Sequence, residues 1–494
     1  MSEKPKNETA DKATDEAKKA DKPAPADDLK TTRHTLGDLA YTATTGRVVL
    51  HEEVTEDDKF NGRQPKAEVS ITWYTLDDAD VTERPVTFAF NGGPGSSSIW
   101  LHMGLLGPRR VDSGDAGNLT PPPFGLLDNE ESLLRHTDLV FIDPISTGYS
   151  RAVEGGNPRD YHGFSKDIES VSEIIRLWTT RNNRWLSPKF LIGESYGGTR
   201  GAGIAEYLQT RFGMALNGVM FIAPAFNMET LYHTSRSELP DPLFLPTYAA
   251  TAHYHGLHEG RTLEEVVEEA RAYADEFRAV LAKGQNLAPE ERAAAVAKVA
   301  SLAGVGEDYV DRANLRLEHT RYYAELLRHK RLVTGRLDTR FTGPADHYTH
   351  EQMPYDPFLT GTDGPYTAAL QYYLRSELEY ENDHVYERLS RAVHPWSYKE
   401  FEGEAVDVIG KLGNVMRLNP FLQVHIAMGR YDGGVPIEAI EYTLDHLEIP
   451  LAARERIETK SYPAGHMMYV HEESRVRQSA DLAEFVQRAS SRER

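Results

Sequence analysis

The chain has 494 residues, of which 40% are hydrophobic and 27% are charged. This composition is typical of a globular protein, and the length exceeds one ordinary compact domain, so a domain with a sizeable insertion is expected. The formal net charge of -21, from 76 acidic and 55 basic residues, argues against nucleic acid or an anionic membrane as the main partner, because polyphosphate binding needs a positive surface.

The sequence contains no cysteine, so neither disulfides nor thiolate metal sites can stabilise it. No apolar stretch is long enough to span a bilayer, and no integral membrane segment is predicted. Residues 1–30 are rich in Lys, Asp, Glu, Ala and Pro and lack the apolar core of a secretory signal, which predicts a disordered polyampholyte tail. We expect a cytoplasmic location for the chain as written, and a periplasmic or secreted one if the N-terminus is processed.

After this tail, short segments rich in Val, Ile, Thr and aromatic residues predict strands. They include TLGDLAYTATTGRVVL, AEVSITWYTL and VTFAFN, followed by apolar runs at 138–143, 189–193, 218–223 and 421–429. Helical patterns such as 168–180 lie between several of these runs. Short apolar strands alternating with helices predict a mainly parallel sheet covered on both faces, built from residues 31–226 and 420–494.

Residues 227–419 have a different pattern. A capping box at Thr262 and Glu265 precedes helical spacing of apolar residues, and further amphipathic helices are predicted at 289–303 and 316–332. We expect a helical insertion that interrupts the α/β core at the place where a lid over a cleft would lie.

The sequence GESYGG, residues 193–198, joins a predicted strand to a predicted helix. A serine flanked by glycines two positions away on each side is typical of a sharp turn that lifts a hydroxyl out of the end of a sheet. The alternative is an ordinary loop that uses glycine for its conformational freedom. The choice depends on whether the partners of a nucleophilic serine follow in the chain.

Two later segments supply such partners. Asp432, in GRYDGGVP, closely follows a predicted strand, and His466, in SYPAGHMMY, lies in a glycine-containing turn. A serine hydroxyl needs a histidine that is itself oriented by a carboxylate, and in this fold class the order is Ser, Asp, His. Each residue alone has a structural explanation, as a turn aspartate or a structural histidine. The order Ser195, Asp432, His466 favours a catalytic triad.

A glycine-rich loop, NGGPGSSSIWLHMGLLGPRRV at 91–111, follows another predicted strand. Such a loop can turn backbone N–H groups toward a developing oxyanion. With NGGPG, GESYGG, DPISTGYS at 143–150 and AGHMMY, the sequence resembles the serine carboxypeptidase family, over about 86–223 and again over 421–469. The resemblance implies an α/β-hydrolase fold, with Ser195 as nucleophile, His466 as general base and acid, Asp432 as its partner, and an oxyanion hole at Gly93 and Tyr196.

The same resemblance implies that Asn91 and Glu194 bind the free carboxylate of a peptide substrate. Glu194 must then be protonated or hydrogen-bonded, since two bare carboxylates repel each other. The family's second glutamate is replaced here by Leu105, the cysteine after NGGPG by Ser96, and its GDxD motif by residues 429–432, GRYD. Strict exopeptidase action is therefore one hypothesis, and an esterase, acyltransferase or less end-specific peptidase with the same triad is another. A non-catalytic binding protein is a more remote alternative.

Other candidate sites are weaker. His347, His350 and Glu351 resemble part of a metal site, but no further ligand follows at a suitable spacing, and an exposed loop is expected. No dinucleotide or phosphate loop is present with its full context, so neither a metal nor a cofactor is predicted. A peptide is the predicted partner, and the oligomeric state is left open.

Overall fold

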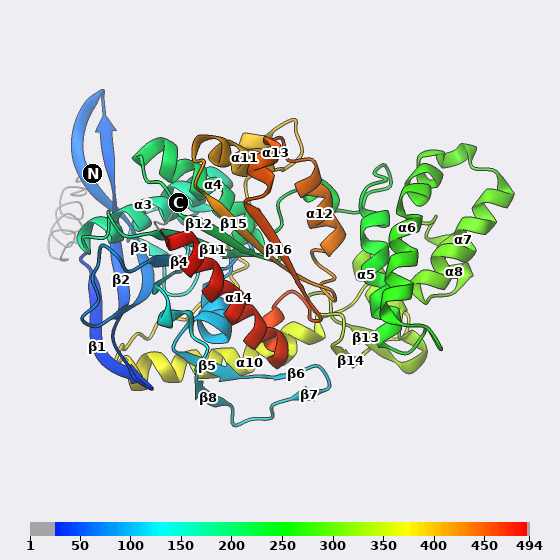
Figure 1. Cartoon of the computed structure of the whole chain (residues 1–494), viewed down its shortest axis with the longest axis horizontal. Helices are drawn as coiled ribbons and strands as arrows, with labels where there is room; N and C mark the ends of the chain where they lie inside the picture. Colours follow the sequence, from blue (N-terminus) through cyan, green and yellow to red (C-terminus); the bar gives the residue numbers. More distant parts are fainter. Residues whose placement is uncertain (1–24, 492–494) are drawn as a thin grey trace, which may run out of the picture.

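The computed structural model describes residues 25–491. Residues 1–24 of the predicted tail lie outside the described residues, and the first strand begins at Asp28, inside that predicted tail. The centre of the molecule is a ten-stranded sheet with the order β1-β2-β3-β9-β4-β11-β12-β15-β16, in which β10 also pairs with β3 (Figure 1). The strands are β1 (Asp28–Leu36), β2 (Leu39–Glu56), β3 (Lys59–Leu76), β4 (Val86–Phe90), β9 (Asp138–Ile142), β10 (Arg151–Ala152), β11 (Lys189–Glu194), β12 (Gly218–Ile222), β15 (Gln423–Gly429) and β16 (Ile457–Tyr462).

The six strands from β9 to β16 in this order are parallel, whereas β1, β2 and β3 are antiparallel at one edge. Every residue of β4, β9, β11 and β12 is buried. This explains why those strands appear as largely apolar runs in the sequence, while β2 and β3, which are exposed at one end, alternate only in part. The predicted mainly parallel sheet is therefore present.

Helices cover both faces of the sheet. In β11, Leu191 packs into the core beneath α3 (Phe164–Arg181), α4 (Tyr196–Phe212) and α11 (Ile409–Leu418). Its neighbours Phe190 and Ile192 point to the opposite face, because side chains alternate along a strand. There they join the core formed with α10 (Pro357–Tyr372) and α14 (Glu472–Ser490).

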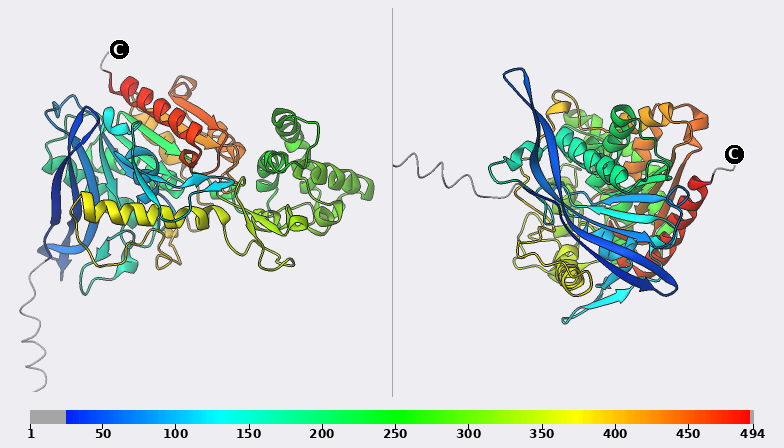
Figure 2. Two further views of the ribbon diagram at one scale, coloured as in Figure 1. Left: turned by 90° about the horizontal axis from the view of Figure 1, so that it is seen from below. Right: turned by 90° about the vertical axis from the view of Figure 1, so that its left-hand side faces the viewer.

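Part of the predicted insertion forms a helical group that projects beyond the C-terminal edge of the sheet (Figures 1 and 2). It consists of α5 (Pro240–Tyr254), α6 (Leu263–Ala282), α7 (Pro289–Ala303), α8 (Glu307–Arg312) and α9 (His319–Glu325). The capping box of α6 is confirmed, since the Thr262 and Glu265 side chains each accept the backbone N–H of the other.

One predicted helix of the insertion is much shorter than expected. The pattern at 316–332 predicts a single helix, but α9 ends at Glu325 and a 3-10 turn over Arg328–Lys330 leads into the short strand β13 (Leu332–Thr334). The backbone leaves the helical conformation at Leu327, with φ -109° and ψ 21°, and Arg331, at φ 62°, ends the 3-10 turn that follows.

The rest of residues 227–419 returns to the body of the protein. The helix α10 crosses the lower part of the molecule in Figure 1, and α11 packs against α4. The segment between them contains only a short 3-10 turn, Lys399–Phe401, after the π-helical end of α10. Among residues 25–491, no helix is both long enough and apolar enough to cross a bilayer.

Candidate active site

Ser195 lies at a sharp turn between β11 and α4. Its backbone has φ 62° and ψ -125°, a conformation that non-glycine residues rarely adopt, and its N–H donates to the carbonyl of Ile222 at 2.9 Å. A Cβ on Gly193 would lie 2.2 Å from the carbonyl oxygen of Gly197. The two glycines therefore let the helix fold back tightly over the strand, which is the sharp turn that the sequence GESYGG predicts.

Asp432 and His466 come together after the neighbouring strands β15 and β16. His466 Nδ1 and Asp432 Oδ2 lie 2.6 Å apart, and both side chains are buried. Asp432 Oδ1 accepts the backbone N–H groups of Gly434 and Val435, at 2.8 and 2.9 Å. The carboxylate is thus fixed by three donors, with one oxygen reserved for the imidazole.

The surroundings of His466 favour its charged form. Burial lowers the pKa of the imidazole, but the charge of Asp432 and its hydrogen bond raise it by more, with a further contribution from Glu194. The net pKa lies above the usual value for histidine. Asp432 can therefore stabilise the imidazolium that forms when His466 takes a proton.

The insertion helps to hold the His466 turn. Leu337 accepts the backbone N–H of His466, and Asp338 Oδ2 accepts the N–H of Gly465 at 3.1 Å. Asp338 is fully buried and also binds the guanidinium of Arg340. This contact means that the insertion contributes to the position of His466.

The glycine-rich loop lies against the serine turn. A Cβ on Gly92 would meet the backbone nitrogen of Tyr196 at 2.5 Å, so only glycine allows this approach. Gly93 has φ 105°, a conformation suited to glycine. Gly92, the residue before Gly93, is therefore packed against the start of α4. The oxyanion hole at Gly93 and Tyr196 stays a prediction.

Glu194 lies buried beside the serine turn, with both carboxyl oxygens hydrogen-bonded. Asn91 Nδ2 donates to Oε1 at 2.9 Å, and the hydroxyl of Tyr469 donates to Oε2 at 2.6 Å. Burial raises the pKa of Glu194 to about 7, although His466 and the two donors favour the ionised form. Leu105 is also buried and belongs to the apolar core. It supplies no second carboxyl group.

A cavity of about 520 Å³ joins these groups. Ser195 and His466 both line it, together with Asn91, Gly93 and Glu194. The remaining lining residues are Gly92, Pro94, Ser96, Trp100, Arg336, Leu337, Leu359, Leu389, Ser390, Arg391, His394 and Met467. Five of the predicted site residues thus line one cavity, whereas Asp432 and Tyr196 do not line it.

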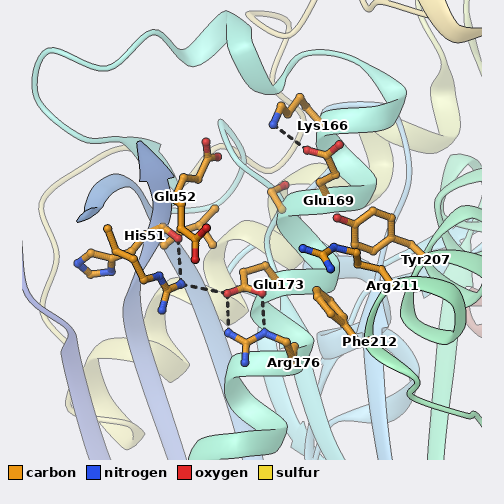
Figure 3. A pocket seen from close by; sticks show the side chains of 13 residues that line it. His51, Glu52, Lys166, Glu169, Glu173, Arg176, Tyr207, Arg211 and Phe212 are labelled. Carbon is orange, nitrogen blue, oxygen red and sulfur yellow. Dashed lines mark hydrogen bonds and ion pairs between the residues drawn. The ribbon is translucent and has the colours of Figure 1, made fainter. Parts of the chain in front are cut away.

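A second opening of about 490 Å³ lies between β2, β3, α3 and α4 (Figure 3). Several of its charged side chains pair with one another. Lys166 binds Glu169 at 2.7 Å, and Arg63 and Arg176 both bind Glu173 (Figure 3). None of the predicted triad residues lines this opening, so the cavity beside Ser195 is the candidate active site.

The side chains of His347, His350 and Glu351, for which an exposed loop was expected, do not converge on one point. His350 Nε2 lies 2.7 Å from Asp346 Oδ1, and His347 contacts the hydroxyl of Thr349. Glu351 instead pairs with Arg321. Within residues 25–491, no group of three or more His, Asp or Glu side chains is arranged to hold a metal ion.

A buried ion pair supports the floor of the site. Arg200, on α4, is fully buried; its Nε donates to Asp167 Oδ2 at 2.8 Å, and Nη1 donates to the backbone carbonyl of Asn91. The guanidinium also lies over the ring of Tyr196, 5.2 Å from its centre. Arg200 therefore connects the loop that carries Asn91 to the helix that follows Ser195.

The Arg200→Met variant is expected to lose about 3–5 kcal/mol of unfolding free energy, because it leaves Asp167 charged and unpaired in the interior. Denaturant unfolding measures this loss. The variant Arg200→Met with Asp167→Asn is the matched control, and it should recover part of the loss because the buried charge is gone. An unchanged stability of the single variant would contradict a structural role for this pair.

Sequence reasoning missed three residues of the site. Tyr469 falls within AGHMMY, but its position near Glu194 depends on tertiary packing. Asp338 and Arg200 have no local pattern, because each acts across more than a hundred residues of sequence. For all three, the sequence shows only a polar residue, and the contact with the motifs becomes visible in the structure.

Comparisons with known proteins found similar sequences and similar structures. A family model described as serine carboxypeptidase matches residues 66–478. A serine carboxypeptidase of Caenorhabditis elegans is 28% identical over 126 residues, which are 25% of this chain and 23% of that protein. Carboxypeptidase Y homolog A of Penicillium rubens is 30% identical over 128 residues, or 26% of this chain and 21% of that protein. The aligned part thus spans less than a quarter of these relatives.

A solved structure extends the likeness to the whole fold. The prohormone-processing carboxypeptidase of Saccharomyces cerevisiae superposes with a TM-score of 0.56, covering 92% of this chain and 91% of that one at 14% sequence identity. At this identity the likeness establishes the fold alone. The predicted α/β-hydrolase fold, with its mixed and mostly parallel central sheet, is confirmed.

Proposed function

The chain belongs to the serine carboxypeptidase family, and we propose that it is a serine-type carboxypeptidase that releases C-terminal amino acids from peptides. The observation that carries this proposal is the buried His466–Asp432 pair at 2.6 Å, in which His466 lines the same cavity as Ser195 and the hydrogen-bonded Glu194. A triad next to a carboxylate-recognition group is what the release of a terminal residue needs.

In the proposed mechanism, the Ser195 hydroxyl attacks the last peptide carbonyl while His466 takes its proton. The backbone N–H groups of Gly93 and Tyr196 stabilise the negative charge that develops on the carbonyl oxygen. His466 then returns the proton to the departing amino group. Water, activated by the same imidazole, hydrolyses the acyl-enzyme and releases the shortened peptide.

The charge of the cavity supports a substrate with a free carboxylate. Arg336, Arg391 and His394 line it in addition to His466, and Glu194 is the single acidic side chain among the lining residues. With its pKa near 7, Glu194 is largely neutral in mildly acidic solution. A negatively charged C-terminus therefore meets a region that is positive, in a protein whose net charge is -21.

A second candidate keeps the triad and changes the substrate. Leu105 is buried and apolar where a second carboxyl group would assist carboxylate recognition, which favours an esterase, an acyltransferase or a less end-specific peptidase. Both candidates use the same nucleophile. They differ in whether the enzyme requires a free C-terminus.

Matched peptides separate the two candidates. The proposed carboxypeptidase is expected to hydrolyse an N-acetylated peptide with a free C-terminus about 100-fold faster, in kcat/KM, than its C-terminal amide, because the amide loses charge-assisted hydrogen bonds at Asn91 and Glu194. Liquid chromatography of the released residues measures both rates. Equal rates on the two peptides, or hydrolysis of esters alone, would favour the second candidate.

A further inference from the structure

Leu105 supplies no carboxyl group to the proposed carboxylate site. A buried carboxyl group can bind a carboxylate only if a proton lies between them, since two bare charges repel. The family's second glutamate would share that task with Glu194, and Leu105 has no proton to share. Another group must fix Glu194 if the cavity is to hold a free C-terminus.

The hydroxyl of Tyr469 is placed where it can hold the carboxyl group of Glu194. It donates to Glu194 Oε2 at 2.6 Å, opposite the 2.9 Å hydrogen bond from Asn91 to Oε1. Both Tyr469 and Glu194 are 3% exposed. Tyr469 does not line the cavity of Ser195, so it acts on a substrate only through Glu194.

The ring of Tyr469 reaches Glu194 along the segment that carries Leu105. A Cβ on Gly104 would lie 2.5 Å from Tyr469 Cε2 and 2.4 Å from the hydroxyl of Tyr366, so glycine at 104 makes room for both rings. Tyr469 belongs to the 3-10 helix Met468–Val470, which begins two residues after His466. One turn therefore supplies both the histidine of the triad and the tyrosine that holds Glu194.

We propose that Tyr469 is a positioning residue that replaces the missing carboxyl group, holding Glu194 for the substrate's free carboxylate so that binding depends on a single proton on Glu194. This inference rests on the proposed function, because it concerns the same carboxylate site. The pair of Tyr469 and Glu194 differs from two glutamates that share one proton. The partner of Glu194 is a neutral hydroxyl, which can donate to an ionised carboxylate or accept from a protonated one.

The pKa shifts of Tyr469 and Glu194 are consistent with a site in which only Glu194 gains or loses a proton. Burial raises the pKa of Tyr469 well above its usual value, so the phenol stays neutral wherever Glu194 titrates. Burial likewise raises the pKa of Glu194 to about 7. The titratable groups that face Glu194 are His466 and Asp432 from the loops after β16 and β15, Tyr469 from its 3-10 helix, and Tyr366 from α10.

The direction of the pH dependence follows. Below the pKa of Glu194 the carboxyl group is protonated and can donate to the substrate; above it the two carboxylates repel, so KM rises by about tenfold per pH unit. The hydrogen bond from Tyr469 favours ionised Glu194. Removing it raises the pKa of Glu194 and moves the rise in KM to higher pH.

The test measures kcat and KM for an N-acetylated peptide with a free C-terminus from about pH 5 to about pH 9. In Tyr469→Phe, the rise in KM is expected about one pH unit above that of the wild type, with kcat changed by less than about threefold. Tyr366→Phe is the matched control, since it removes a hydroxyl from the same packed pair of rings without a hydrogen bond to Glu194, and its profile should match the wild type.

Binding provides a readout that does not need turnover. In a Ser195→Ala background, calorimetry of the same peptide and its amide is expected to give a Kd that rises with pH for the free peptide only, with the same displacement in Tyr469→Phe. An unshifted profile in Tyr469→Phe, or an equal shift in Tyr366→Phe, would overturn the inference while leaving the proposed activity intact. The opposite outcome is also distinct. If the wild type cleaves no peptide, but Kd for the free peptide still rises with pH and Tyr469→Phe still displaces that rise, the proposed activity is overturned and the inference is retained.

Discussion

The Ser195→Ala variant is expected to lose peptide hydrolysis by about a millionfold in kcat, because the triad loses the atom that forms the acyl-enzyme. What residual rate is left would come from the oxyanion hole and binding alone. The backbone strain at Ser195, with φ 62°, is maintained by the surrounding turn and not by its hydroxyl. The fold should therefore survive the substitution.

Steady-state kinetics and labelling by a fluorophosphonate measure this loss together, with circular dichroism as the check on folding. Ser479→Ala is a suitable control, since Ser479 is also buried and its hydroxyl has no hydrogen-bond partner among residues 25–491. That variant should keep full activity. Turnover or labelling that persists in Ser195→Ala would show that another residue is the nucleophile.

The Asp432→Asn variant is expected to lower kcat by about 10⁴-fold. The amide oxygen can still accept from Gly434 and Val435 at the Oδ1 position, so the loop should keep its shape. The amide nitrogen would then face His466 Nδ1 and donate to it. This stabilises the tautomer whose other nitrogen carries the proton and cannot act as a base toward Ser195.

A second carboxylate–histidine pair in the same sheet provides the control. Glu458 Oε1 lies 2.6 Å from Nδ1 of the buried His425, on the paired strands β16 and β15, outside the cavity. Glu458→Gln should change kcat by less than about threefold, even if it lowers stability. A comparable loss of activity in both variants would mean that Asp432 acts through stability and not through His466.

Much of the fold could be predicted because its parallel strands are short and several of them are separated by helices. The buried strands β4, β9, β11 and β12 are largely apolar runs, and parallel strands covered on both faces require such runs. The capping box at Thr262 fixed the start of α6. The helix predicted at 316–332 was wrong in length, because the break in helical geometry at Leu327 depends on tertiary context that hydrophobic spacing does not contain.

The site likewise has residues that could be predicted from local motifs and contacts that could not. Ser195, Asp432 and His466 could be named because each lies in a motif whose turn is local to the sequence. Their approach to one another could not be measured from sequence, since it depends on the order of β11, β15 and β16 in the sheet. Tyr469 was missed because its contact with Glu194 spans 275 residues, and a tyrosine after a histidine turn has no distinct pattern.

The most direct test of the central claim is a time course of the digestion of an N-acetylated peptide with a free C-terminus, followed by mass spectrometry. The enzyme is compared before and after reaction with a fluorophosphonate. The account predicts consecutive loss of single residues from the C-terminal end, only in the untreated enzyme. Internal fragments, or the same losses after the nucleophile is blocked, would contradict it.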